Sequence, residues 1–275
     1  SMFVEPTTEN EIFNILNILN VRKSSGDDDI RPKNIKCNAI VLTPIVTSLG
    51  NQSISTATIP KQLKTSIIRP IYKSGEKNEV NNYRPISILP VMEKVLEEII
   101  VKRLNSFLVK YNIINNSQYG FQRGKNINQL LGRFADTINT ALSKVEHCLV
   151  LFIDFSKAFD TLSHSKLLLI LERNGIRGHI LAWFRDYLNL RRYRVKINNK
   201  ISEEIGTNQG VPQGSKLGPL LFFIFSNDML NILNDCYTYA YADDTAIIVT
   251  NKNIQIATDI MQKQLDRVCQ WCHDN

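Results

Sequence analysis

Two adjacent carboxylates interrupt an apolar stretch near the end of this chain and constrain its fold more than any other feature. Asp243 and Asp244 lie between residues 237–242 (Tyr-Thr-Tyr-Ala-Tyr-Ala) and residues 245–249 (Thr-Ala-Ile-Ile-Val). This pattern predicts a β-hairpin with both acids at its tip. Two anionic groups packed together raise the pKa of at least one of them unless a cation compensates. The pair indicates either a cation site or a turn in which Asp bonds to the local backbone, and by itself it does not separate the two.

A third carboxylate follows a second apolar segment. Residues 148–153 (Cys-Leu-Val-Leu-Phe-Ile) form an apolar run of strand length that ends at Asp154, which predicts a strand buried on both faces. If this strand and the hairpin are neighbours in one sheet, three carboxylates converge. Oxygen ligands without His or Cys favour Mg²⁺ or Mn²⁺ over zinc. Such a site suits phosphoryl transfer assisted by two metal ions.

The remaining periodicities predict an α+β fold, because helices alternate with antiparallel hairpins. Thr8 and Glu11 form a capping-box pattern before a first helix. Further helices are predicted at residues 91–111, 126–145, 164–174, 178–189, 216–229 and 254–272, and a strand at residues 64–72. In a predicted hairpin, Arg192, Arg194 and Lys196 alternate with apolar residues. They are either available to phosphates or an ordinary exposed strand face.

Charge and cysteine content restrict the partners and the compartment. The 275 residues include 33 Lys and Arg against 26 Asp and Glu, and the net charge of +7 indicates nucleic acid or an acidic membrane surface as partner. No apolar stretch approaches the roughly 18 residues that span a bilayer, so we expect no membrane crossing. Five scattered cysteines and a start without a signal-peptide pattern favour an intracellular protein, in the cytoplasm or nucleus, that is not secreted.

Five ordered motifs resemble those of reverse transcriptases. Residues 152–160 (Phe-Ile-Asp-Phe-Ser-Lys-Ala-Phe-Asp), 208–219 (Asn-Gln-Gly-Val-Pro-Gln-Gly-Ser-Lys-Leu-Gly-Pro) and 241–244 (Tyr-Ala-Asp-Asp) have the order and spacing of the palm motifs. Residues 82–87 and 118–124 resemble the fingers motifs. From about residue 20 to its end, the chain is similar to the reverse transcriptases of LINE-type retrotransposons, which lack long terminal repeats. The resemblance implies a right-hand polymerase fold with an antiparallel palm sheet and fingers of helices and strands.

The resemblance also implies a division into domains. We expect an N-terminal helical extension at residues 1–62, fingers at 63–147 and palm at 148–275. After Asp244 there are 275 − 244 = 31 residues, so we expect the next palm motif, the primer grip and the thumb to be absent. Weak or absent processive synthesis would follow. Both an excised fingers and palm fragment and a decayed or repurposed genomic copy fit this ending.

Catalytic and nucleotide-binding roles are implied for individual residues. Asp154 and Asp243 would be the principal ligands of Mg²⁺ or Mn²⁺, with Asp244 beside them as a weaker or more distant ligand. Phe159 matches a steric gate that excludes the ribose 2′-hydroxyl, although a Phe there also suits a core position. The implied nucleotide-binding residues are Lys73 and Arg84 at the triphosphate, Phe155 and Phe159, and Gln213 and Gly214 beneath the incoming base pair.

The same resemblance implies contacts with nucleic acid and an activity. The nucleic-acid-binding residues would be Arg123, Arg192, Arg194, Lys196 and Tyr241. The implied function is an RNA-directed DNA polymerase, which transfers nucleotides from dNTPs to the 3′-hydroxyl of a DNA primer on an RNA template. The alternative is a catalytically idle fragment that binds nucleic acid through its basic surface. An RNA-dependent RNA polymerase is disfavoured by Phe159.

Overall fold

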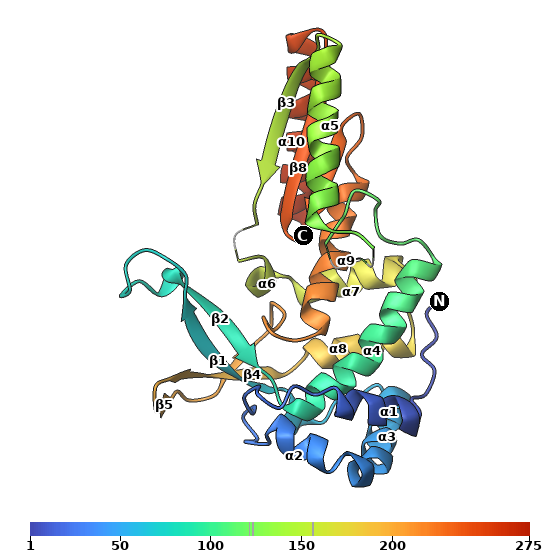
Figure 1. The fold of residues 1–275 in the computed structure, drawn as a ribbon, viewed down its shortest axis with the longest axis vertical. Helices are drawn as coiled ribbons and strands as arrows, with labels where there is room; N and C mark the ends of the chain where they lie inside the picture. The colour runs from blue at the N-terminus through green and yellow to red at the C-terminus, as the bar shows by residue number, and fades with distance from the viewer. Residues whose placement is uncertain (121, 123, 156) are drawn as a thin grey trace. The chain divides into compact units, whose positions relative to one another are not determined.

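The chain folds into two compact units, each assembled from two segments of the sequence. The structure is a computed structural model that describes residues 1–120, 122, 124–155 and 157–275. The first unit contains residues 1–110 and 159–218, and the second contains residues 111–158 and 219–275. Helices and strands alternate along both, which confirms the mixed helix and sheet composition (Figure 1). The subdomain boundaries expected after residues 62 and 147 stay a prediction.

The first unit combines a sheet with six helices of more than one turn among its described residues. Its strands are β1 (Thr65–Tyr72), β2 (Tyr83–Ile88), β4 (Arg191–Ile197), β5 (Lys200–Ile201) and β6 (Ile205–Thr207). Its helices are α1 (Glu9–Asn17), α2 (Pro32–Cys37), α3 (Ala39–Thr56), α4 (Val91–Lys110), α7 (His164–Arg173) and α8 (His179–Leu188), with 3₁₀ turns η1 (Lys61–Leu63) and η2 (Val80–Asn82). The short α6 (Ala158–Thr161) and α9 (Leu217–Asn231) each contain a boundary between the units.

The sheet of the first unit has the order β2-β1-β4-β5, and β6 also pairs with β4. β1 and β2 are antiparallel, whereas β1 and β4 are parallel. Pro70 of β1 lies opposite Pro85 of β2. β2 is an edge strand, so it tolerates a proline that cannot donate to the hydrogen-bond ladder. The hairpin that carries Lys73 and Arg84 is therefore an edge hairpin of this sheet.

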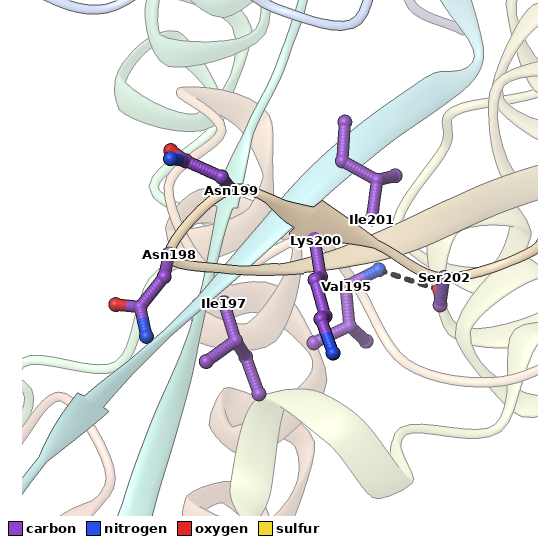
Figure 2. Close-up of a pocket in the computed structure, with 7 residues that line it drawn as sticks. All are labelled: Val195, Ile197, Asn198, Asn199, Lys200, Ile201 and Ser202. Carbon is purple, nitrogen blue, oxygen red and sulfur yellow. Dashed lines mark hydrogen bonds between the residues drawn. The ribbon is translucent and has the colours of Figure 1, made fainter.

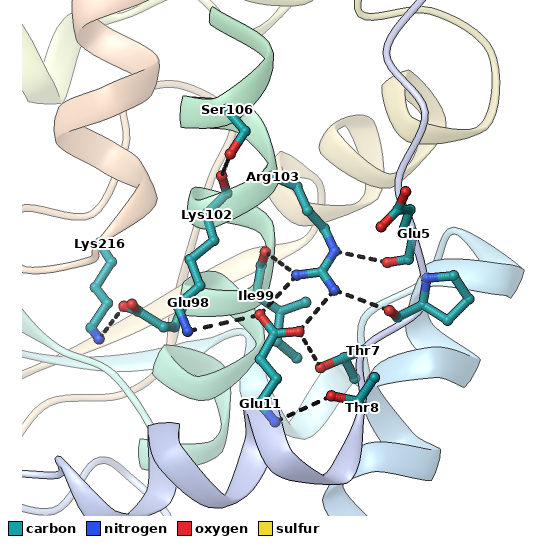
Figure 3. A network of polar contacts seen from close by, with 11 residues as sticks. Glu5, Thr7, Thr8, Glu11, Glu98, Ile99, Lys102, Arg103, Ser106 and Lys216 are labelled. Atoms are coloured by element: carbon teal, nitrogen blue, oxygen red, sulfur yellow. Dashed lines mark hydrogen bonds and ion pairs between the residues drawn. The ribbon is translucent and has the colours of Figure 1, made fainter. Parts of the chain in front are cut away.

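A polar network joins the start of the chain to α4 (Figure 3). Thr8 caps α1 as predicted, because its hydroxyl accepts the Glu11 N–H at 3.3 Å. The Glu11 carboxylate, however, pairs with Arg103, whose Nη1 and Nη2 donate to its two oxygens at 3.0 and 2.9 Å. Arg103 lowers the pKa of Glu11 below its ordinary value. The Arg103 Nε also donates to the Glu5 carbonyl, which fixes the leading segment against α4.

An ionic cluster lies inside the first unit, where α4, α8 and β4 meet. The Arg191 Nη2 donates to Glu93 Oε1 at 2.6 Å, and both side chains are almost fully buried. Glu97 accepts from the Tyr187 hydroxyl at 2.6 Å and from the Lys216 N–H at 2.7 Å. Among the described residues, Glu93 Oε2 has no hydrogen-bond partner. Burial raises the pKa of Glu93 to about 7, and the charge of Glu97 adds to that rise.

The second unit is a three-stranded antiparallel sheet with helices on it. The sheet order is β3-β8-β7, formed by β3 (His147–Ile153), β7 (Tyr237–Tyr241) and β8 (Asp244–Asn251). Leu130 of α5 (Ile127–Ser143) packs with Ala246 and Ile248 of β8. α10 (Ile254–Asp274) packs against β3 and β8. No helix in the described ranges combines the length and apolarity that crossing a bilayer requires.

The prediction that residues 148–153 are buried on both faces is wrong. Phe152 is 73% exposed and Val150 is 36% exposed. The physical reason is position: among the described strands β3 pairs with β8 alone, so it forms an edge of the sheet. An uninterrupted apolar run is typical of a central strand, but apolarity does not report how many neighbours a strand has.

The buried carboxylate of Glu93 makes stability depend on pH. Between pH 4.5 and about 7 the folded chain retains a proton that the unfolded chain has released, so the free energy of unfolding falls as the pH rises through this window. We expect a fall of about 3 kcal/mol, since one pKa unit corresponds to about 1.4 kcal/mol. Denaturant unfolding of Glu93→Gln at several pH values should show a weaker dependence, to which Glu97 still contributes because burial raises its pKa as well. Glu98→Gln, on the same helix, serves as the control, and an unchanged pH slope in Glu93→Gln contradicts the assignment.

Candidate active site

The register of the second sheet brings the three predicted acids to one end of it. Ile153 of β3 pairs with Thr245 of β8, so one further step places Asp154 opposite Asp244. On the other side of β8, Tyr241 pairs with Asp244, and Asp243 lies in the connection. The prediction that the apolar strand and the hairpin are neighbours in one sheet is confirmed. Three carboxylates, separated by up to 90 residues in the sequence, thus lie at the same end of the sheet.

A tight turn carries Asp243. Residues 242 and 243 are the two residues between β7 and β8, and Ala242 has φ +59°. Asp243 does not have a positive φ, so the turn has the left-handed conformation at its first central position alone. A residue with a Cβ in that region costs about 1–3 kcal/mol, and it persists where surrounding contacts enforce it. The backbone that leads into Asp243 is therefore held against its local preference.

The turn and its neighbour Asp154 carry negative charge that no nearby cation of the described chain neutralises. Burial raises the pKa of Asp244, and the charges of Asp243 and Asp154 raise it further. Asp154 therefore lies close enough to Asp244 for their charges to interact. Within the part of the chain that the structure describes, no Lys or Arg forms an ion pair with any of the three acids. The end of the sheet is a place where a cation is stabilising.

The donor set fits a hard divalent cation, because it consists of carboxylate oxygens without His or Cys. The described residues contain no group of three or more Asp, Glu, His or Cys side chains already arranged around a common point. Carboxylates repel one another when no cation lies between them. Asp154 and Asp244 are exposed, and Asp243 is half-buried.

A segment before α5 holds the backbone of the acidic turn. Gln118 is fully buried, and its side-chain carbonyl accepts the Ala242 N–H at 3.1 Å while its amide donates to the Ala242 carbonyl at 3.3 Å. A Cβ on Gly120 would lie 2.5 Å from the Ala242 nitrogen, so this position requires glycine. Sequence reasoning placed both residues in a fingers motif and missed these contacts. No local signal marks a glutamine whose partner lies 124 residues away.

Two other predicted residues of the second unit have different surroundings. Phe155 is half-buried and packs edge-on against Phe222 and Trp271, with ring centroids 6.3 and 6.2 Å away. Its ring therefore has a packing role in this unit. Tyr241 is 37% exposed at the end of β7, next to the acidic turn. Its ring is accessible to a ligand.

The predicted triphosphate-binding cations lie together on the edge hairpin of the first unit. The Lys73 N–H donates to the Asn82 carbonyl at 2.8 Å, which continues the β1–β2 ladder beyond Tyr72. Because side chains alternate along strands, Lys73 and Arg84 project from the same face of this hairpin. Both are exposed, and neither forms an ion pair with a carboxylate in the described ranges. Their charge is available to an anion.

In the first unit, hydrogen bonds connect the predicted gate residue Phe159 and its neighbour with the predicted nucleotide-binding loop at residues 210–214. The Val211 N–H donates to the Phe159 carbonyl at 2.7 Å, and the Gln213 amide donates to the Asp160 carboxylate at 2.9 Å. The Ser87 N–H donates to the Gln213 carbonyl at 2.7 Å. A Cβ on Gly214 would lie 2.5 Å from the Ser87 carbonyl oxygen, and Gly214 has φ +127°. The loop and β2 are thus in close backbone contact, which explains the glycine.

The predicted nucleic-acid-binding cations of β4 are partly engaged within the chain. Arg192 pairs with Glu204 at 3.0 Å and Arg194 with Asp27 at 3.5 Å. Lys196 forms no ion pair with a described residue. Arg123 lies outside the described residues. Carboxylates of the same unit thus partly neutralise Arg192 and Arg194, and their role in nucleic-acid binding stays a prediction.

The hairpin of β4 and β5 encloses an open groove (Figure 2). The Val195 N–H donates to the Ser202 hydroxyl at 2.9 Å across the hairpin. The lining residues are Val195, Ile197, Asn198, Asn199, Lys200, Ile201 and Ser202. None of them is a predicted site residue, but the predicted nucleic-acid-binding residues Arg194 and Lys196 alternate with Val195 and Ile197 along β4.

Comparisons with known proteins agree with the motifs. The family described as Reverse transcriptase (RNA-dependent DNA polymerase) matches residues 71–275. The probable RNA-directed DNA polymerase from transposon BS of Drosophila melanogaster is 29% identical over 280 residues, covering 99% of this chain and 31% of that protein. The corresponding protein of transposon X-element of the same species is 32% identical over 254 residues, covering 90% of this chain and 28% of that protein.

A third relative extends over the whole chain. The RNA-directed DNA polymerase from mobile element jockey of Drosophila melanogaster is 28% identical over 282 residues, covering 100% of this chain and 31% of that protein. The chain thus spans less than a third of each of these three relatives. The family match and these similarities confirm the resemblance to LINE-type elements: this chain belongs to the reverse transcriptase family.

Proposed function

We propose that this chain performs RNA-directed DNA synthesis, in which a DNA primer is extended with dNTPs on an RNA template. The observation that carries the proposal is the meeting of Asp154, Asp243 and Asp244 at one end of the β3-β8-β7 sheet. In this proposal that sheet is the palm sheet of a right-hand polymerase, and the β1–β2 hairpin belongs to its fingers. The names of the relatives, which are RNA-directed DNA polymerases, support the assignment.

The acids provide a binding site for the cations that nucleotidyl transfer uses. Asp154 and Asp243 would be the principal ligands, and Asp244 would add negative charge beside them. Bound Mg²⁺ or Mn²⁺ supplies activation of the primer 3′-oxygen and neutralises charge on the departing pyrophosphate. Burial and the charges of Asp243 and Asp154 raise the pKa of Asp244, and the same negative potential favours a bound cation.

The first unit would bind the nucleotide. Lys73 and Arg84 present positive charge from one face of the edge hairpin, and a guanidinium suits paired phosphate oxygens. Phe159, Gln213 and Gly214 are connected through the backbone contacts of residues 210–214 with α6 and β2. The incoming deoxynucleotide would contact these residues, with Phe159 closest to the sugar. Phe155, which is packed in the second unit, would act through support of Asp154.

Template and primer would bind through positive charge spread over the chain. The net charge of +7 favours a polyanion. Among the predicted contacts, Lys196 forms no ion pair with a described residue and Tyr241 is 37% exposed. Arg192 and Arg194 would exchange Glu204 and Asp27 for phosphates on binding.

Replacing one carboxylate tests the proposed chemistry. Asp243→Asn removes a charge from the cation site, and we expect single-nucleotide addition to a primer on an RNA template to slow by about 100- to 1,000-fold, equivalent to about 3–4 kcal/mol. Asp266→Asn, on the exposed face of α10, is the matched control and should keep full activity. Equal rates in the Asp243→Asn and unmodified chains contradict the proposal. Duplex binding without any nucleotide addition would favour the catalytically idle alternative.

Shortening the gate residue tests the choice of sugar. We expect Phe159→Ala to reduce the preference for dNTPs over ribonucleotides by about tenfold or more, because removal of the ring leaves room for a 2′-hydroxyl. Phe159→Tyr keeps the bulk and should keep the preference. Competition between one dNTP and the matching ribonucleotide gives the ratio directly. An unaltered ratio in a folded Phe159→Ala chain would show that Phe159 is a core residue.

A further inference from the structure

We propose that Gln118 is a positioning residue for Asp243: its buried side chain holds the peptide that leads into this carboxylate, and so sets the affinity of the acidic turn for a divalent cation. The inference rests on the proposed function, because it assigns Gln118 a task in the same cation site. The Gln118 side chain bonds to backbone atoms of the turn and would touch neither cation nor nucleotide. It is therefore distinct from the three acids.

Both the carbonyl oxygen and the amide nitrogen of the Gln118 side chain form hydrogen bonds with backbone groups, in its own segment and in the acidic turn. Its side-chain carbonyl accepts the N–H groups of Tyr119 at 3.0 Å, Gly120 at 2.9 Å and Ala242 at 3.1 Å. Its amide nitrogen donates to the Ala242 carbonyl at 3.3 Å. The side chain is fully buried, so water does not compete for these bonds. Both polar backbone groups of Ala242 thus bond to one side chain.

These bonds act on the residue that has the unfavourable backbone angle. Ala242 has φ +59°, and its carbonyl belongs to the same planar peptide as the Asp243 nitrogen. A bond to this carbonyl fixes the orientation of that peptide plane, and with it the direction in which the Asp243 side chain leaves the turn. Without Gln118, the turn would lose the contacts that enforce φ > 0 at a residue with a Cβ.

The backbone next to Gln118 follows β7 closely. The Tyr119 N–H donates to the Ala240 carbonyl at 2.7 Å, and the Ala240 N–H donates to the Ser117 carbonyl at 2.9 Å. Gly120 lies so close to the turn that a Cβ would be 2.5 Å from the Ala242 nitrogen. Residues 117–120 thus form a support along the strand that ends at the acidic turn. Gln118 extends this support from β7 to the turn itself.

Amide exchange and Mn²⁺ titration together test the inference. In the unmodified chain we expect the Ala242 N–H to exchange slowly with deuterium, although it lies in a surface turn. In Gln118→Leu we expect fast exchange at Ala242 and about tenfold weaker Mn²⁺ binding, measured by electron paramagnetic resonance, as is typical when a residue that orients a metal ligand is lost. Gly120→Ala, which displaces the same turn and leaves Gln118 in place, should show both effects.

The control is a second buried glutamine of the same unit. Gln264 of α10 is 1% exposed and accepts the Asn234 N–H, and none of its hydrogen bonds with described residues reaches the acidic turn. Gln264→Leu should leave Ala242 exchange and Mn²⁺ affinity unchanged. Equal loss in Gln264→Leu would reduce the effect to general destabilisation and overturn the inference, as would unchanged Mn²⁺ affinity in a folded Gln118→Leu chain.

Three outcomes distinguish failure of this inference from failure of the proposed function. Should the Gln118→Leu chain fail to fold, fast exchange at Ala242 in the unmodified chain still overturns the inference, because the Gln118 bonds would then not restrain the turn. Should the unmodified chain bind no Mn²⁺, the proposed cation site fails and this inference fails with it. If Mn²⁺ binds normally and Gln118→Leu has no effect, the inference alone fails.

Discussion

Mutual repulsion among three carboxylates at the end of one sheet is the constraint on which this molecule depends. The antiparallel register of β3 and β8 places Asp154 opposite Asp244, and the tight turn adds Asp243 beside them. Burial raises the pKa of Asp244, and the charges of Asp243 and Asp154 raise it further, so the arrangement disfavours the charged form of this carboxyl group. The sheet maintains it because apolar burial behind the acids is extensive, as the fully buried Ile247 and Ile248 of β8 illustrate.

A second group of buried charges supports the first unit in a comparable way. Glu97 accepts the Lys216 N–H, and Lys216 follows the loop that carries Gln213 and Gly214. The same cluster contains Arg191, at the start of the strand β4 that pairs with β1. Buried ion pairs are costly to break, because removal of one partner leaves the other charge uncompensated. The cluster therefore links α4 and β4 to the end of the predicted nucleotide-binding loop.

The sequence predicted those elements in which local periodicity and tertiary environment agree. The helices α4, α5 and α10 and the acidic hairpin lie where the pattern indicated, and the adjacency of β3 and β8 is confirmed. α3 was not identified, because it contains Pro44 and its apolar residues do not gather on one helix face. The burial of β3 was overestimated, since periodicity does not reveal an edge. Gln118 was missed as a support of the turn because its partner is backbone from a distant strand, and side-chain identity alone does not encode that pairing.

The most direct measurement of the central claim is a crystal structure of this chain grown with Mn²⁺, with anomalous diffraction recorded at the manganese edge. We expect an anomalous peak bounded by the carboxylates of Asp154 and Asp243, with metal-oxygen distances of about 2.0–2.3 Å, close to those of Mg²⁺ sites. Asp243→Asn crystals should lose or weaken that peak. Strong anomalous peaks elsewhere on the chain, with none between these two carboxylates, would contradict the account.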